Sequence, residues 1–221
     1  MKSLWSEEEA SGMSDLDQLV YQSRLVGAEP SLVLGGGGNT SLKTTETDFR
    51  GLECRVLRVK GSGTDMKSIQ RQGFPGVLLE HVLPLLERED MSDEEMVDYL
   101  NHCLVEPNAP RPSIETLLHA FIPQRSIVHS HADAILSITN THKAKSLLSD
   151  AFGSSIVIVP YRRPGFLLSK EVALSARSSP QARGVVLLNH GLVTWGDTLR
   201  TAYESHIDLV SQAEDFIAQS S

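Results

Sequence analysis

The feature that most constrains the fold of this 221-residue chain is its alternation of short β-rich runs with helical patterns. The segment DLDQLVYQSRLVG (15–27) has apolar residues at helical spacing, with Ser14 or Asp15 to cap its start and Gly27 to end it. Several runs with strand-like composition meet glycine or polar clusters, as strands do at loops; they are SLVLGGGGNTSLKTT, CRVLRVKGSGTDM, RSIVHSH, SSIVIVPY and RGVVLLNHGLVTWG. Together these patterns predict an α/β layered domain with a central sheet.

Further helices are expected between and after these strands. SDEEMVDYLNHCLV is well capped and has acids in its first turn, and PSIETLLHAFIP lies between two prolines with Ser113 as its N-cap. GFPGVLLEHVLPLLERED is expected to form a strand or short apolar turn followed by a helix. The other helical patterns are ADAILSITN, LSKEVALSARSS and TLRTAYESHIDLVSQAEDFIAQ. A chain of this length forms one sizeable core, so we expect an N-terminal extension over 1–14 and one domain over 15–221.

Composition excludes several classes of partner. A formal net charge of −8, without a block of lysine and arginine, makes nucleic acid a poor candidate. No apolar run approaches the roughly 20 residues that a membrane-spanning helix needs, so we expect no membrane partner. The segment MKSLWSEEEASGMSDLDQ carries acids where a signal peptide has its apolar core, which favours a cytoplasmic protein. Cys54 and Cys103 fit no metal-ligand spacing and are expected to be reduced and partly buried.

Two histidines separated by one residue, His129 and His131, end the run RSIVHSH. In a strand, residues i and i+2 point to the same face, so these imidazoles would project side by side and could share one metal ion. From the pair alone, hydrogen-bonded or solvated histidines are the more frequent explanation. The best third partner is His190, at the Asn-His-Gly corner of VVLLNHGLVTWG. Three imidazoles from two strand ends would form a site with an open coordination position, which is the catalytic pattern for zinc.

Glu115 and His119 lie four residues apart on one predicted helix, so their side chains share a face. An acid at the start of a helix can simply complement the helix dipole, or it can stand beside a metal ion and transfer protons. The sequence leaves both interpretations of Glu115 open. For His119, packing of the helix is favoured over a role as a metal ligand.

Two glycine-containing loops, GGGGNTS (35–41) and KGSGTD (60–65), follow predicted strands. Glycine permits close approach and positive φ, so such loops can surround a phosphate group, although tight turns alone would also explain them. Together with Pro112-Ser113 at a helix start, they could enclose one small phosphate. Neither loop matches the P-loop or the dinucleotide-binding fingerprint, so an oxidoreductase function lacks support here.

The ordered set GGGGNTS, VKGSGTDM, PSIETLLH, HSHADA and LLNHGL resembles the class II aldolase/adducin family. That family includes L-fuculose-1-phosphate and L-rhamnulose-1-phosphate aldolases and L-ribulose-5-phosphate 4-epimerase. The resemblance runs from about Asp15 to the last helix and looks closest to the aldolase domain of bifunctional rhamnulose-1-phosphate aldolase/alcohol dehydrogenases, which continue into a dehydrogenase domain. It implies a three-layer α/β/α domain with a central, mainly antiparallel β-sheet. It also implies a homo-oligomer, with a tetramer favoured, whose active sites lie between subunits.

The resemblance also assigns roles to residues. It implies that His129, His131 and His190 bind Zn²⁺ or another divalent metal, and that Glu115 is the general acid/base or completes the metal shell. It implies a set of phosphate- and substrate-binding residues from the two loops and the helix start, with Thr64 as a further neighbour; the set is Gly38, Asn39, Thr40, Ser62, Gly63 and Ser113.

This sequence departs from the family pattern in two places. Ile114 stands where many of the aldolases have a second serine, which removes one phosphate contact. The C-terminal tyrosine that some of the aldolases use has no counterpart.

We therefore expect a zinc-dependent aldolase, a carbon–carbon lyase that cleaves a phosphorylated ketose to dihydroxyacetone phosphate and an aldehyde through a metal-stabilised enediolate. A sugar-phosphate 4-epimerase or a dehydratase acting at the same metal stays open as an alternative. A non-catalytic, adducin-like interaction module is a third possibility, which the presence of all three histidines disfavours.

Overall fold

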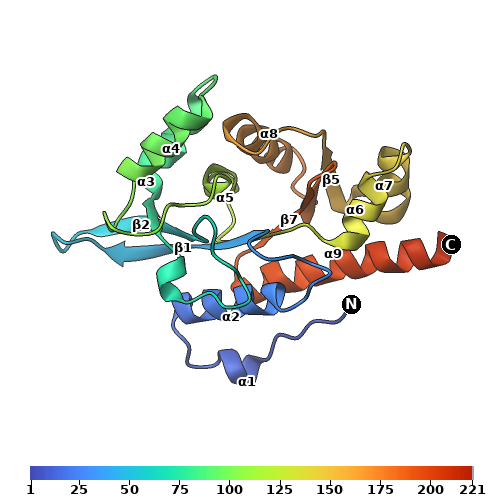
Figure 1. Cartoon of the computed structure of the whole chain (residues 1–221), viewed down its shortest axis with the longest axis horizontal. Coiled ribbons are helices and arrows are strands. Elements are labelled where there is room, and N and C mark those ends of the chain that lie inside the picture. Colours follow the sequence, from blue (N-terminus) through green and yellow to red (C-terminus); the bar gives the residue numbers. More distant parts are fainter. Residues whose placement is uncertain (221) are drawn as a thin grey trace.

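The computed structural model describes residues 1–220. Within them, seven strands form one mixed sheet in the order β3-β2-β1-β4-β7-β6-β5 (Figure 1). The strands are β1 (Asn39–Thr47), β2 (Glu53–Val59), β3 (Gly76–Leu78), β4 (Ser126–Ser130), β5 (Ile156–Val159), β6 (Gly184–Leu187) and β7 (Gly191–Gly196). All neighbouring strands are antiparallel except β5 and β6, which run parallel.

Helices cover both faces of this sheet. Figure 1 shows α2 and α9 beneath the sheet, with α6 and α7 at its right-hand end, and α4, α5 and α8 above it. The lower group is α2 (Asp15–Gly27), α6 (Asp133–Thr139), α7 (Ala144–Phe152) and α9 (Leu199–Ser220). The upper group is α3 (Leu79–Val82), α4 (Asp93–His102), α5 (Thr116–Phe121) and α8 (Phe166–Arg177). Short 3-10 turns occur at Arg71–Gly73, Leu83–Glu87 and Gly153–Ser155.

The central strand β4 is buried on both faces, and its side chains alternate between two cores. Ile127 packs with Leu118 of α5 and Val172 of α8 above the sheet. Its neighbour Val128 packs with Ile207 of α9 below the sheet. The three-layer α/β/α architecture with a mainly antiparallel sheet is therefore confirmed.

The N-terminal segment that precedes α2 packs against the domain. It includes the short helix α1 (Glu7–Ala10). The Trp5 ring lies 5.2 Å from the Tyr21 ring of α2 and 6.2 Å from the Tyr203 ring of α9, measured between ring centroids. None of the helices within residues 1–220 is both long and apolar enough to cross a membrane.

Local capping signals were accurate guides to several helices. The Ser14 side chain accepts a hydrogen bond from the backbone of Asp17 at the start of α2, and Ser92 and Glu95 form a reciprocal capping box at the start of α4. The helix α7 was not predicted. Its N-cap residue, Lys143, makes no side-chain capping hydrogen bond, and only Leu148 and Phe152 of its residues are buried.

Candidate metal centre

Three histidines converge where β4 ends and β7 begins. His129 lies near the end of β4, His131 follows that strand, and His190 directly precedes β7. The two strands are antiparallel neighbours, so the end of one lies beside the start of the other. One nitrogen from each ring lies within 4.8 Å of the other two, which is close enough for a shared metal ion. The structure thus brings together all three predicted ligands.

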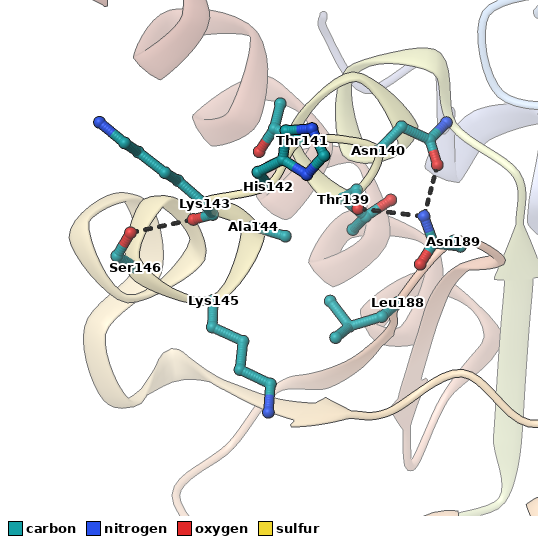
Figure 2. A pocket seen from close by; sticks show the side chains of 10 residues that line it. All are labelled: Thr139, Asn140, Thr141, His142, Lys143, Ala144, Lys145, Ser146, Leu188 and Asn189. Atoms are coloured by element: carbon teal, nitrogen blue, oxygen red, sulfur yellow. Dashed lines mark hydrogen bonds between the residues drawn. The ribbon is translucent and has the colours of Figure 1, made fainter.

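The Asn-His-Gly corner owes its shape to the residues on either side of His190. Asn189 has a φ of 58°, a left-handed conformation that asparagine tolerates better than most residues. Its side-chain amide donates hydrogen bonds to the Thr139 carbonyl oxygen (3.2 Å) and to Asn140 Oδ1 (2.7 Å) at the rim of a surface pocket (Figure 2). At Gly191, an added Cβ would lie only 2.2 Å from a backbone oxygen of β4, so the close approach of the two strands requires glycine.

Glu115 reaches the same cluster from the upper layer. Its side chain is buried, with Oε1 3.3 Å from Nε2 of His190 and Oε2 3.6 Å from Nε2 of His129. The helix α5 begins at Thr116, so Glu115 is its N-cap residue and the prediction of Ser113 as N-cap is wrong.

The later start of α5 has a local cause. Pro112 forms an isolated β-bridge with Gly61, and Ser113 N donates to the Lys60 carbonyl oxygen (3.3 Å), which keeps the chain extended at this point. Ser113 still shapes the turn, because its Oγ accepts a hydrogen bond from Glu115 N (3.2 Å). The carboxylate is therefore held at the N-terminus of α5, facing the histidines.

The protonation states suit a cation. Burial lowers the pKa of His129 to about 4 and also lowers that of His131, so both imidazoles are neutral near neutral pH. Burial by itself raises the pKa of the Glu115 carboxyl, but the imidazoles of His129 and His190 and the Asn39 amide together bring it below its ordinary value. The cluster thus combines the neutral imidazoles of His129 and His131 with a carboxylate.

Three atoms in the cluster make no hydrogen bond within the described residues. They are Nε2 of His129, Nδ1 of His190 and Oε1 of Glu115, all buried. Nδ1 of His129 is 3.0 Å from the Leu192 carbonyl oxygen, to which it must donate, and this leaves a lone pair on Nε2. Buried polar atoms rarely stay unpaired, and a divalent metal ion at this position would engage the lone pair on Nε2 of His129. The donor set fits such an ion.

A polar network lies directly behind the carboxylate. Asn39 at the start of β1 is buried, and its Nδ2 donates to Glu115 Oε2 (2.7 Å) and to Ser113 Oγ (3.2 Å). Asn39 Oδ1 lies 2.5 Å from Nε2 of His119, and Nδ1 of His119 lies 2.7 Å from Ser41 Oγ. Helix packing alone, the interpretation favoured from the sequence, does not account for these polar contacts of His119.

The two glycine loops lie side by side next to this network. Lys60 Nζ donates to the Gly36 carbonyl oxygen (3.1 Å), and Lys60 N donates to the Thr40 carbonyl oxygen (3.1 Å). Gly38 and Gly63 have positive φ values of 62° and 76°, which glycine adopts without strain.

Ser62 and Gly63 are exposed in the second loop, whereas Lys60 is only 3% exposed. Burial lowers the pKa of Lys60, opposed by the negative charges of Glu115 and Asp65. Lys60 was not among the residues predicted for the site, although its place directly before Gly-Ser-Gly was a usable signal.

Thr40 is the exception among the predicted substrate-binding residues. Successive side chains of a strand point to opposite faces, so Thr40 points away from the face that carries Asn39. Its hydroxyl makes a short hydrogen bond with Ser23 of α2, below the sheet. The Thr40 side chain is therefore not brought to the cluster. Ile114, at the position of the missing serine, packs against the core above β2 and β3.

Comparison with known proteins places the chain in a family. The family model described as Class II Aldolase and Adducin N-terminal domain matches residues 17–216. A curated relative from Bacillus subtilis (strain 168), called Uncharacterized oxidoreductase YuxG, is 46% identical over 218 residues, which is 98% of this chain and 32% of the relative. The chain thus spans about a third of the length of that relative.

Solved structures agree with this match. The N-terminal class II aldolase domain of a conserved protein from Thermoplasma acidophilum is 48% identical, with a TM-score of 0.91 and coverage of 98% of this chain and 99% of that one. A sugar-phosphate aldolase from Thermotoga maritima has the same fold at 16% identity, with a TM-score of 0.66 and coverage of 93% and 96%. The chain belongs to the class II aldolase and adducin family.

Proposed function

We propose that this domain is a zinc-dependent aldolase that cleaves a phosphorylated ketose to dihydroxyacetone phosphate and an aldehyde. The observation that carries the proposal is the meeting of a buried carboxylate, Glu115, with three imidazoles, two of which lie within 3.6 Å of its oxygens. Retro-aldol cleavage requires a group that takes up a hydroxyl proton and a site that tolerates negative charge on the substrate oxygens. Glu115 would meet the first requirement, and a metal ion on the three imidazoles would meet the second.

The residues that would hold the metal are His129, His131 and His190. When bound, a divalent cation supplies Lewis acidity that polarises a carbonyl group and stabilises negative charge on oxygen. Three protein nitrogens leave at least one coordination position for substrate, as in catalytic zinc sites.

Glu115 is the proposed proton carrier. Its carboxylate accepts a hydrogen bond from Asn39 Nδ2 (2.7 Å), and this donor favours the ionised form that can accept a proton from the substrate. Its Oε1 makes no hydrogen bond within the described residues, so that oxygen has a free acceptor position. The later return of the proton to the product regenerates the carboxylate.

The glycine loops are the proposed phosphate site. Gly38, Ser62, Gly63 and Ser113 supply backbone amides and hydroxyl groups, and the buried ammonium group of Lys60 adds positive charge between the loops. Binding the phosphate here would orient the reacting carbons relative to Glu115. The relative from Thermotoga maritima is called a sugar-phosphate aldolase, which agrees with this class of substrate.

A 4-epimerase or a dehydratase acting on a sugar phosphate would use the same groups, so the product decides between them and an aldolase. The name oxidoreductase belongs to a relative of which this chain covers 32%. We further propose that the chain forms a homotetramer, as the family resemblance implies, and that it is cytoplasmic. Analytical ultracentrifugation of the purified chain would test the assembly.

The test couples metal analysis to a product assay. Purified protein supplied with zinc should bind one metal ion per chain and release dihydroxyacetone phosphate from at least one ketose phosphate in a panel. His129→Ala should lose both the metal and the product. His102→Ala provides a matched control, because among the described residues this exposed histidine of α4 bonds only to the Asp98 carbonyl oxygen in its own helix.

Two outcomes would contradict the proposal. Protein that stays free of metal in the presence of zinc would rule out the mechanism. Metal-loaded protein that yields an epimer or a dehydrated sugar, with no dihydroxyacetone phosphate, would replace the aldolase with one of the alternatives.

A further inference from the structure

His119 is completely buried on α5, and both of its ring nitrogens are engaged. Nε2 lies 2.5 Å from Asn39 Oδ1 and Nδ1 lies 2.7 Å from Ser41 Oγ. Neither nitrogen is left for a metal ion, so His119 belongs to the site in another way. It does not contact the carboxylate directly, because the Asn39 side chain lies between His119 and Glu115 and bonds to both.

Glu115 is the last member of this series of hydrogen bonds, and its carboxylate determines the direction of each of them. An ionised carboxylate only accepts hydrogen bonds, so the nitrogen of the Asn39 amide must face it. The amide oxygen then faces His119 and can only accept, which places the imidazole proton on Nε2. Nδ1 is left as an acceptor, and the Ser41 hydroxyl donates to it. Donation therefore runs in one direction, from Ser41 through His119 and Asn39 to Glu115.

The surroundings of His119 keep it in one protonation state. Burial lowers the pKa of His119 to about 3, so the ring is neutral near neutral pH. A neutral imidazole has one donor and one acceptor nitrogen, and here each has a partner of the matching kind.

We propose that His119 is a positioning residue whose Nε2–H fixes the orientation of the Asn39 amide and thereby holds the Glu115 carboxylate for proton transfer. Without this donor, the amide can turn by 180° and present Oδ1 to the carboxylate, where two acceptors would face each other. The kinetic consequence rests on the proposed aldolase function. The direction of the hydrogen bonds does not.

The first experiment reads the tautomer directly. Long-range proton–nitrogen correlation spectra of the full chain with nitrogen-15-labelled histidine distinguish a proton on Nε2 from one on Nδ1, and the His119 signal is assigned by its loss in His119→Gln. We expect a neutral ring with the proton on Nε2. A proton on Nδ1 would overturn the proposal, because Asn39 would then be turned the other way.

The second experiment separates positioning from packing. His119→Leu keeps the bulk of the side chain but removes the donor, whereas the Nε2 amide of His119→Gln can donate from a similar place. With zinc content matched, His119→Leu should lower kcat about 10- to 100-fold with little change in KM, as for other residues that orient a ligand or catalytic group. His119→Gln should restore most of that loss. Equal losses in the two variants would overturn the proposal.

A double-mutant cycle then identifies the route. In an Asn39→Ala background, His119→Leu should cause no further loss of kcat, because the amide through which it acts is gone. Additive losses would contradict action through Asn39. If the wild-type chain releases no dihydroxyacetone phosphate, the proposed function fails, but the tautomer measurement still decides the role of His119. That measurement also stands if His119→Leu does not fold.

Discussion

A helix on each face of the sheet carries a completely buried histidine, and the comparison between these two residues separates chemistry from architecture. His119 lies above the sheet on α5 and His206 lies below it on α9. His206 also bonds through both nitrogens, with Nε2 2.6 Å from Ser130 Oγ and Nδ1 2.9 Å from Thr194 Oγ1. Burial lowers the pKa of each histidine to about 3.

The two networks differ in where they end. Below the sheet, the Thr194 hydroxyl donates to the Ala202 carbonyl oxygen (3.2 Å), so Nδ1 of His206 must be the donor to that hydroxyl. That network ends on a backbone carbonyl and fastens β4 and β7 to α9. Above the sheet, the network ends on the ionisable oxygen of Glu115. Two histidines in similar surroundings thus have opposite tautomers, and only the one above the sheet is coupled to a group that can react.

The largest expected effect comes from the reactive end of the upper network. Glu115→Gln keeps the size of the side chain and its contact with Asn39 but removes the group that accepts a proton. We expect kcat to fall about 10²- to 10⁴-fold, the range found when a general acid/base is removed. Zinc content by elemental analysis should stay near that of the wild type. Retention of full activity would show that the proton carrier is another residue.

A smaller effect should separate the two histidines. His206→Leu leaves the hydroxyls of Ser130 and Thr194 without their buried partner, and each unpaired buried group costs about 1–3 kcal/mol. We expect urea denaturation to give a lower free energy of unfolding for His206→Leu and for His119→Leu alike.

Measurement of kcat distinguishes these two variants. Only His119→Leu should lower kcat at matched zinc content, because the network of His206 reaches no group of the proposed proton-transfer machinery. A comparable loss of kcat in His206→Leu would show that the lower network also sets the geometry of the site.

The three histidines and the fold could be predicted from the sequence because their signals are local. The alternation in RSIVHSH and the Asn-His-Gly corner mark strand ends, and a strand end fixes where its last side chains point. The family pattern over Glu115 and the loops reinforced these signals. The start of α5 was placed too early, because pairing of Pro112 with Gly61 overrides the capping preference of Ser113.

The networks behind the site could not be predicted in this way, because they depend on register and layer. Asn39 meets His119 only because β1 pairs with β4 so that Asn39 stands opposite His129, while α5 crosses above that pair. Thr40 was predicted for the site for the same reason, although its side chain points to the opposite face of the sheet. Nothing in GGGGNTS indicates which residue begins the strand. Lys60 was missed because its burial depends on contact with the other loop.

The smallest expected effect is a pH dependence that the two histidines should share. Each has a folded pKa of about 3 and an ordinary value of 6.5, so between these values the unfolded chain binds a proton that the native state does not. The contribution of these two histidines to the free energy of unfolding is therefore fully present above pH 6.5 and is lost as pH falls toward 3. Near pH 5 the loss is about 1 kcal/mol per pH unit for each histidine. Urea denaturation of metal-free protein at pH 6 and pH 5 measures this slope. His206→Leu and His119→Gln should each flatten it by about 1 kcal/mol per pH unit, because each removes one group that binds a proton only after unfolding. If the free energy of unfolding of either variant changes with pH as steeply as that of the wild type, the replaced histidine is not held neutral in the native state. The comparison between the two faces would then be wrong for that histidine.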